Sequence, residues 1–286
     1  MRRGTIGSLL SPGGIFGLIV VGTAVVCAGF ASQLSQQNPF DLVQLSVADS
    51  QLPPGSLGSN GIVYWLGSDD QGRDIVSAIL YGLRISLLVA IASTSIAFVL
   101  GTSIGLSAAY AGGWLDLVFM RLADIQLAFP GILIALVLLS VLGSGIDKVV
   151  IAIVAVQWAY YARTARSVAI IERSKEYILA AQSLRFSAAR IIFSHLLPNS
   201  LSALSVVVIV QIAGGIALEA TLSFLGMGLP ITQPSLGLLI ANGYTSMLSG
   251  EYWLSFYPGF VLLLLLVGIN LIGERLRELN DPRESL

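Results

Sequence analysis

The sequence predicts an all-α polytopic membrane protein with six transmembrane helices. Hydrophobic residues make up 55% of the 286 residues and charged residues only 11%, whereas roughly a quarter of the residues in a soluble protein are charged. The mean hydropathy is +0.85. Six stretches are apolar over the length of about 20 residues that a helix needs to cross a hydrocarbon layer of about 30 Å.

The six expected spans are separated by polar or glycine-rich segments. They cover residues 14–32, 85–109, 115–142, 149–165, 201–225 and 253–273. In the second span, Gly101 and Gly105 have a spacing that lets neighbouring helices approach closely. In the third span, Pro130 lies near the middle, so we expect the helix to bend there.

The spans divide the chain into a series of segments. These are an N-terminal segment (1–13), the first helix (14–32), an external segment leading into the second helix (33–84), a transmembrane core (85–273) and a tail (274–286). The core includes a loop at 166–199 and a second external loop at 226–252. The 33–84 segment is rich in Pro, Gly, Ser and Asp, so we expect irregular structure there.

The distribution of basic residues predicts the orientation. If the N-terminus is cytoplasmic, twelve of the fifteen Lys and Arg residues lie on or near the inner side, and only Arg73, Arg84 and Lys148 lie outside. This satisfies the positive-inside rule. Both termini and the 166–199 loop are therefore expected in the cytoplasm.

Residues 176–199 form the longest polar-bearing segment between two apolar spans. Ser174 is suited to cap a helix, and Glu176 in its first turn suits the positive end of the helix dipole. The spacing i, i+3, i+4 and i+7 predicts one apolar stripe on this helix. Its members are Tyr177, Ala180, Ala181 and Leu184.

A second short helix is expected to begin at Ser187. It should end near Leu197, because Pro198 disfavours helical geometry in the residue before it. The segment therefore predicts a helix-turn-helix on the membrane surface.

The chain lacks the signatures of several enzyme and metal sites. Neither Lys148 nor Lys175 follows the glycine of a Gly-Lys-Ser/Thr phosphate loop. The single histidine, His195, and the single cysteine, Cys27, make a poor transition-metal site. We therefore expect no catalytic or metal site, and a bracing hydrogen bond is the expected role of His195.

Three aspartates precede the second span, at positions 69, 70 and 74. Their spacing differs from that of a calcium-binding EF-hand loop, which also ends on a glutamate. Turn formation and capping of the following helix are the expected roles.

Polar side chains inside the spans are candidates for the translocation path. A carboxylate near a helix centre costs about 3 kcal/mol, so it usually faces protein or water. Glu219 is expected either to line a path or gate or to make a buried hydrogen bond. Asp124 has Arg121 as an expected ion-pair partner one turn away. Gln157 and Gln211 are further path candidates, although such residues often join helices.

The 176–199 segment resembles the cytoplasmic "EAA" loop of binding-protein-dependent ABC importer permeases. The matching positions are Glu176, Tyr177, Ala180, Ala181, Ile191, His195, Leu197, Pro198 and Asn199. Two positions depart, because Leu179 stands where the family pattern has Glu, and Arg185 stands where it has Gly. A glycine would permit positive φ at that turn, which arginine adopts at a cost.

Further motifs are similar to the dipeptide, oligopeptide and nickel branch of this family, and they follow in the family's order from about residue 64 to 283. They are YWLGSDDQGRDIVSAILYGLRISL, AAYAGGWLDLVFMRLADIQLAFP, LEATLSFLGMGLP, PSLGLLI and NLIGERLRELNDPR. The first 60 or so residues carry little of the resemblance.

The resemblance implies a multi-pass permease subunit of the bacterial cytoplasmic (inner) membrane, half of a path for di- or oligopeptides. It implies a homologous second permease subunit, two cytoplasmic ATPase subunits and an extracytoplasmic substrate-binding protein. ATP and Mg would be bound by the ATPase subunits, and this chain would bind no cofactor and no nucleic acid. The residues implied in ATPase coupling are Glu176, Tyr177, Leu179, Ala180, Ala181, Leu184, Arg185, His195 and Pro198.

Three alternatives remain open at this point. The same architecture could carry nickel or another small solute. An ion-coupled secondary transporter would use Glu219 and Asp124 to bind the coupling ion, although we find no convincing internal repeat of the kind common in such transporters. A membrane scaffold would use the loop only to recruit a cytoplasmic protein.

Overall fold

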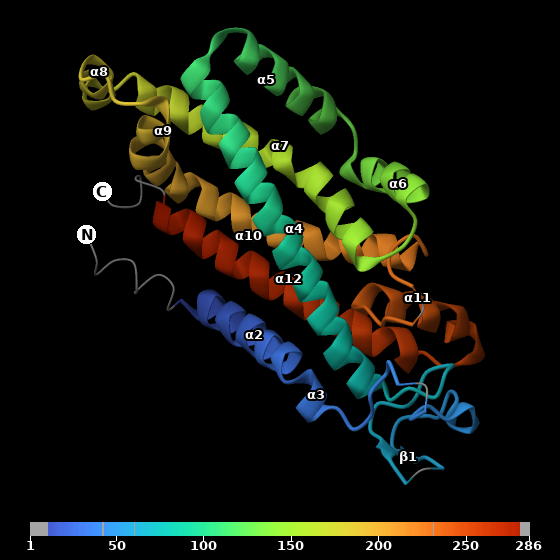
Figure 1. The fold of residues 1–286 in the computed structure, drawn as a ribbon. Helices are drawn as coiled ribbons and strands as arrows, with labels where there is room; N and C mark the ends of the chain where they lie inside the picture. The colour runs from blue at the N-terminus through green and yellow to red at the C-terminus, as the bar shows by residue number, and fades with distance from the viewer. Residues whose placement is uncertain (1–10, 42, 60, 231, 281–286) are drawn as a thin grey trace.

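The structure, a computed structural model, describes residues 11–41, 43–59, 61–230 and 232–280. The described part is dominated by long helices, and a small irregular segment with the strand β1 lies at one end (Figure 1). It is the fold expected of an all-α polytopic membrane protein. The first ten residues and residues 281–286, which belong to the expected N-terminal segment and tail, lie outside the described residues.

Helices α2 (Pro12–Gly29) and α12 (Trp253–Asn280) lie side by side (Figure 1). A Cβ atom added to Gly17 would lie 2.7 Å from the carbonyl oxygen of Gly268, so the two backbones are almost in contact. A one-turn helix, α3 (Ala31–Leu34), follows α2. The first expected span is thus a helix packed against the last.

Helices α4 (Ile75–Ala111) and α7 (Ile146–Arg173) cross at the two glycines predicted to allow close approach. A Cβ atom at Gly101 would lie 2.2 Å from the carbonyl oxygen of Trp158, and one at Gly105 would lie 2.2 Å from that of Ala162. The small-residue prediction is confirmed. Helix α4 begins ten residues before the apolar span at Ile85, because Asp74 caps it within the 33–84 segment.

The third expected span is two helices, α5 (Gly113–Ala128) and α6 (Gly131–Leu142), which meet at an angle of 96°. The break falls at Phe129 and Pro130, and Phe129 has an extended backbone with ψ 145°. A proline disfavours helical geometry in the preceding residue, which explains why the helix ends there. The predicted bend at Pro130 is therefore confirmed, in the stronger form of a break.

Four helices of the described chain are long and apolar enough to cross a membrane, or five if the bent pair α5–α6 is one span. Helix α7 contains the expected fourth span but also carries Gln157, Arg163 and Arg166, and it is not among them. The number of six spans stays a prediction.

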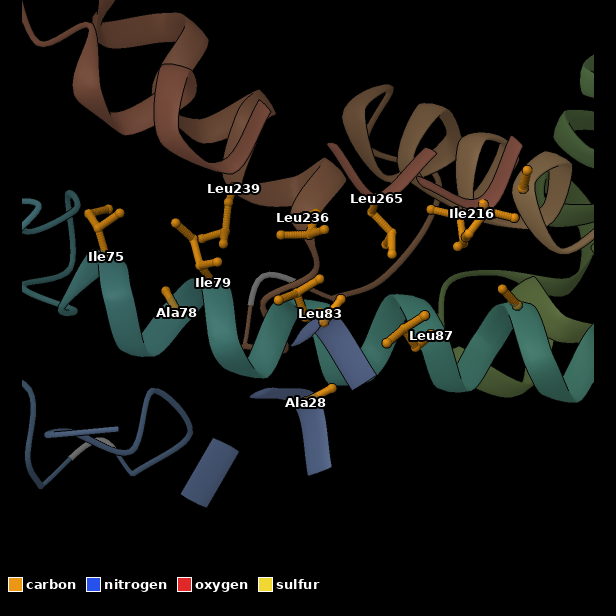
Figure 2. Packing of buried hydrophobic residues seen from close by; sticks show 14 of the residues in the cluster. Ala28, Ile75, Ala78, Ile79, Leu83, Leu87, Ile216, Leu236, Leu239 and Leu265 are labelled. Carbon is orange, nitrogen blue, oxygen red and sulfur yellow. The ribbon is translucent and has the colours of Figure 1, made fainter. Parts of the chain in front are cut away.

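The principal core lies where α4 meets α10 (Leu197–Phe224), α11 (Leu236–Ser246) and α12 (Figure 2). Figure 2 shows apolar side chains of α4 facing those of α10, α11 and α12. They include Ile75, Ile79, Leu83, Leu87, Ile216, Leu236, Leu239 and Leu265. A short 3₁₀ turn, η3 (Met247–Ser249), joins α11 to the segment before α12.

The 33–84 segment, which was expected to be external, contains a 3₁₀ turn, η1 (Val47–Asp49), and a two-stranded antiparallel sheet of β1 (Ser56–Leu57) and β2 (Val63–Tyr64). Asp74 is the N-cap of α4 and accepts a hydrogen bond of 2.9 Å from the Ser77 amide. Asp69 accepts bonds of 2.9 Å from two backbone amides within its turn. The predicted roles in capping and turn formation are confirmed for these two aspartates.

Candidate functional site

The loop between α7 and α10 forms a helical hairpin, which we call the hairpin (residues 174–199). Its first helix is α8 (Glu176–Ser183) and its second begins as α9 (Ala188–Ile191). It lies at the end of the molecule opposite β1 and α11 (Figure 1). A helix-turn-helix is therefore present where the sequence predicted one.

The expected end of the second helix near Leu197 is wrong. A five-residue π-helical turn, η2 (Ile192–Leu196), follows α9, and α10 then begins directly at Leu197. Pro198 lies in the first turn of α10, where a missing backbone N–H costs little. The wider π turn thus carries the chain into the long helix without a stop.

The second helix begins as predicted, with Ser187 as its N-cap, whereas the expected cap of the first helix is wrong. The Ser187 hydroxyl accepts a hydrogen bond of 3.3 Å from the Arg190 amide. The N-cap of α8 is Lys175 and not Ser174, because the Ser174 hydroxyl already donates to the carbonyl oxygen of Ile171 at 2.8 Å.

The turn of the hairpin contains an arginine with positive φ. Arg185 has φ 55°, in the left-handed region. Its amide donates to the Gln182 carbonyl at 2.9 Å, and the Phe186 amide donates to the Ala181 carbonyl at 3.1 Å. These two bonds are the pair that terminates a helix in a Schellman motif. Arginine therefore occupies a position at which glycine would be unstrained.

The predicted apolar stripe of α8 is only partly buried. Of its four members Ala181 alone is buried, and the other buried residue of α8 is Ile178. Tyr177, Leu179 and Leu184 are 42%, 51% and 69% exposed. Ile178 was missed, although its spacing of three from Ala181 was visible in the sequence.

A hydrogen-bonded network braces the hairpin against α7 and α10. Oε1 of Glu172, near the end of α7, accepts from Lys175 Nζ at 2.5 Å, and Oε2 accepts from the Tyr177 hydroxyl at 2.5 Å. The Asn199 side-chain amide, in α10, donates to the Tyr177 hydroxyl at 3.1 Å and to the His195 carbonyl at 2.7 Å. Three helices therefore meet at one tyrosine.

The network alters the protonation of Tyr177 and Glu172. The hydrogen bond to the Glu172 carboxylate raises the pKa of Tyr177 to about 12. The hydrogen bonds from Lys175 and Tyr177 hold the pKa of Glu172 below its usual value. Both groups therefore stay in the form that keeps the network intact at neutral pH. Sequence analysis missed Glu172, whose only signal was its position three residues before Lys175.

His195 contributes its ring and its backbone to this network. Its ring meets that of Tyr177 edge to face, with centroids 6.0 Å apart. Its carbonyl oxygen accepts the bond from Asn199. The side-chain hydrogen bond expected of His195 remains a prediction.

Glu219 lies far from the hairpin, in the last turns of α10, and its side chain is fully buried. Oε2 accepts a hydrogen bond of 2.7 Å from the Ser86 hydroxyl of α4, and Oε1 accepts one of 2.8 Å from the Ser223 hydroxyl. Ser235, the N-cap of α11, is a further hydrogen-bond partner. This carboxylate joins three helices, and no sequence pattern marked Ser86 as its partner.

Gln157 and Gln211 lie together, and Gln211 precedes Glu219 by eight residues, about two turns of α10. The side-chain amide of Gln157 donates to the backbone carbonyl of Gln211 at 2.7 Å, and its oxygen accepts from the Thr94 hydroxyl at 3.2 Å. The contact joins α7, α10 and α4. Only the backbone of Gln211 takes part in it.

The expected ion pair of Asp124 with Arg121 is wrong. Asp124 pairs with Arg163 of α7 at 3.2 Å. The partner comes from another helix, because α5 lies along α7 (Figure 1).

Comparisons with known proteins bear on what these features do. Residues 101–286 match the family described as binding-protein-dependent transport system inner membrane component. The chain is 36% identical to the dipeptide transport system permease protein DppC of Alkalihalophilus pseudofirmus, over 94% of this chain and 85% of that protein. It is 31% identical to the DppC of Bacillus subtilis (96% and 82%) and 33% identical to the glutathione transport system permease protein GsiD of Pectobacterium atrosepticum (94% and 85%).

Proposed function

Because this chain belongs to the binding-protein-dependent transport system inner membrane components, we propose that its hairpin couples ATP hydrolysis on a separate subunit to movement of the helices. The observation that carries the proposal is the bracing network around Tyr177. It joins a protruding hairpin to the ends of α7 and α10. A push on the hairpin would therefore move both long helices as levers.

The exposed apolar side chains of α8 supply the docking surface in this proposal. Leu179 and Leu184 are 51% and 69% exposed and lie next to the buried pair Ile178 and Ala181. An apolar groove on an ATPase subunit would bury them. Six further residues are proposed to complete this coupling surface or to position it. They are Glu176, Tyr177, Ala180, Arg185, His195 and Pro198.

The proposed orientation places the hairpin in the cytoplasm, with six spans and both termini on the same side. The start of α2, the end of α12 and the hairpin lie at one end of the molecule, and the external segment and α11 lie at the other (Figure 1). The distribution of arginine and lysine supports the assignment of the hairpin end to the cytoplasm.

The proposed cargo is a short peptide. Support comes from the relatives, which are named as dipeptide, peptide and glutathione permeases. Nickel or another small solute is the second candidate, through the family branch that the motifs resemble. An ion-coupled transporter is disfavoured, because membership of a binding-protein-dependent family implies a separate source of energy.

The proposed partners are a homologous second permease subunit, two ATPase subunits that bind ATP and Mg, and an external substrate-binding protein. This chain would form half of the translocation path and would itself hydrolyse nothing. Membership of a binding-protein-dependent transport family supports the ATPase and binding-protein partners.

Glu219, Gln211 and Gln157 are proposed to act at the path or its gate by holding α4 against α7, α10 and α11. Opening a gate would require these buried hydrogen bonds to break or slide. The Glu219→Gln variant is therefore expected to assemble with its partners and to transport peptide more slowly. Unchanged assembly, ATP hydrolysis and uptake would remove Glu219 from this role.

The test of coupling is peptide-stimulated ATP hydrolysis by the co-purified complex in liposomes. We expect Leu184→Glu to lower both ATPase binding and stimulation, and the control Leu184→Met to leave them unchanged, because it keeps an apolar side chain of similar volume. Uptake by the permease pair without ATPase subunits would contradict the proposal and support an ion-coupled transporter. ATPase binding without any peptide-dependent stimulation would support a scaffold.

A further inference from the structure

Helix α5 contributes little to the chain's own core. Of its 16 residues only Ala123 is buried. Large apolar side chains of α5 are exposed, among them Trp114 (70%), Leu117 (61%), Leu122 (51%) and Ile125 (58%). The helix lies on the side of α7 away from α2 and α12 (Figure 1). Something other than this chain must therefore cover part of α5.

A charged hollow of about 360 Å³ lies between α5 and α7. Its ionisable lining residues are Asp116, Arg121, Asp124, Arg163 and Arg166. Arg166 forms a two-pronged bond with Asp116, at 2.5 and 2.6 Å, and Arg163 pairs with Asp124 at 3.2 Å. Among the residues that the structure describes, Arg121 has no ion-pair partner. The hollow therefore carries one uncompensated positive charge.

A second hollow on α7 has the opposite character. It lies between α7 and α4, has a volume of about 460 Å³, and has an almost entirely apolar lining. Ile104, Ile151 and Trp158 are among its lining residues. Helix α7 thus presents one face suited to lipid or an apolar helix and another face suited to water.

The charged hollow lies at the inner ends of two expected spans, because Arg121 and Asp124 belong to the first turns of the third span (115–142) and Arg163 to the last turn of the fourth (149–165). Charged side chains at membrane depth face protein or a water-filled cavity and not lipid, because their transfer into hydrocarbon costs several kcal/mol. The Asp124–Arg163 pair is still about half exposed, at 47% and 56%. The exposed side of this hollow therefore needs water or a second protein beyond it.

We propose that the α5–α7 hollow lines the cytoplasmic mouth of a water-filled translocation path, facing a second permease subunit across that path. The assignment rests on the proposed function. It extends that function by assigning the α5–α7 hollow as the surface that lines the path and Arg121 as the residue that contacts the cargo. Arg121 is the contact for the terminal carboxylate of a passing peptide, because its guanidinium is the one left without an acidic partner in the hollow.

Two matched cysteine variants test which of the two hollows is accessible to water. Met120 and Ile104 lie eight residues after and eight before Gly112, which joins α4 to α5, and both are half-buried. Met120 lines the charged hollow and Ile104 the apolar one. In a Cys27→Ala background, each variant is assembled with its partners in liposomes and treated with a charged thiol reagent that does not cross membranes.

We expect Met120→Cys to react about tenfold or more faster than Ile104→Cys, because only the thiolate reacts and an apolar environment suppresses its formation. Equal rates at the two positions, or faster reaction at Ile104→Cys, would overturn the proposal. Slow reaction at both would place the charged hollow against lipid or tightly packed protein and would overturn it too.

Arg121 is tested by uptake of a peptide with a free carboxylate. Arg121→Gln should lower the uptake rate roughly two- to fivefold, the range expected for one exposed charge pair, and Arg121→Lys should restore most of it. Equal uptake by Arg121→Gln and the parent would remove the carboxylate contact. In both experiments, failure of this inference alone leaves peptide-stimulated ATP hydrolysis intact, whereas failure of the proposed function abolishes it in the parent complex.

Discussion

The Tyr177 hydroxyl donates a 2.5 Å hydrogen bond to Glu172 and accepts one of 3.1 Å from Asn199. Glu172 lies near the end of α7 and Asn199 near the start of α10, so one phenol connects the two long helices on either side of the hairpin. The π-helical turn η2 (Ile192–Leu196) lies in the chain between Tyr177 and Asn199, so their hydrogen bond joins segments on its two sides. A π-helical turn, which is frequent at functional sites, is thus spanned by a side-chain contact between α8 and α10.

The Tyr177→Phe change should loosen the hairpin. It removes both hydrogen bonds of the hydroxyl and keeps the ring beside His195, at a cost of about 1 kcal/mol. We expect faster hydrogen exchange in α8 and less peptide transported per ATP hydrolysed. Tyr160→Phe is the control, because Tyr160 and Tyr177 are 44% and 42% exposed. The bridging role would be wrong if both variants matched the parent in exchange and coupling.

Arg185→Gly should stabilise the turn of the hairpin. The left-handed conformation costs a residue with a Cβ atom about 1 kcal/mol, and glycine adopts it without strain. The Phe186 amide, which bonds to the Ala181 carbonyl, should therefore exchange more slowly. As a control, Arg190→Gly within α9 should destabilise that helix by about 1 kcal/mol, because glycine has a lower helix propensity than arginine. Destabilisation by Arg185→Gly would mean that the arginine side chain supports the turn.

Gly105→Ala should disrupt the crossing of α4 and α7. The added Cβ atom would lie 2.2 Å from the Ala162 carbonyl oxygen, so the helices must separate. Overpacking of this kind costs about 1–3 kcal/mol. Gly22→Ala in α2 is the control, because its Cβ atom would meet nothing within 4 Å. The measurement is the thermal unfolding midpoint in detergent, and equal midpoints for the two variants would contradict the predicted clash.

Asp69 should make the external segment sensitive to pH. Burial raises the pKa of Asp69 to about 6, despite opposing hydrogen bonds from the Arg73 and Gln71 amides and the nearby Arg73 charge. Its neighbour Asp70 raises the pKa further. Since the folded pKa lies above the unfolded value of 3.8, the proton's contribution to stability is complete below pH 3.8 and is lost as the pH rises through 6.

Asp69→Asn should remove this dependence. Asparagine keeps the oxygen that accepts from the Gln71 and Arg73 amides, each at 2.9 Å. Hydrogen exchange of the Arg73 amide, corrected for its intrinsic pH dependence, should slow in the parent between pH 7 and 5, because protonation of Asp69 raises the free energy of opening by about 1 kcal/mol. The variant should change less over the same range. Parallel pH profiles would show that Asp69 stays ionised.

Much of the helical framework could be predicted from the sequence, because its signals are local. Apolar runs located the helices, Gly101 and Gly105 located a close crossing, and Pro130 located a break. These three signals depend on nearby residues in the sequence. The turn geometry at Arg185 stayed open, because the family pattern has glycine there and arginine adopts positive φ at a cost.

The contacts between distant parts of the chain could not be predicted in this way. Three predictions were wrong: the cap of α8, the ion-pair partner of Asp124 and the end of the second hairpin helix before Pro198. Local sequence patterns do not reveal which competing hydrogen bond or which neighbouring helix lies nearby. Glu172 and Ser86 gave too little sequence signal to be assigned.

The sequence by itself determined the all-α membrane class, the helical hairpin and the family, since these depend on composition, periodicity and ordered motifs. Only the tertiary structure decided which charges pair, which face of α7 is polar and how Tyr177 joins α7 to α10. Those properties depend on which side chains meet when the helices pack, and residues far apart in the sequence supply the partners.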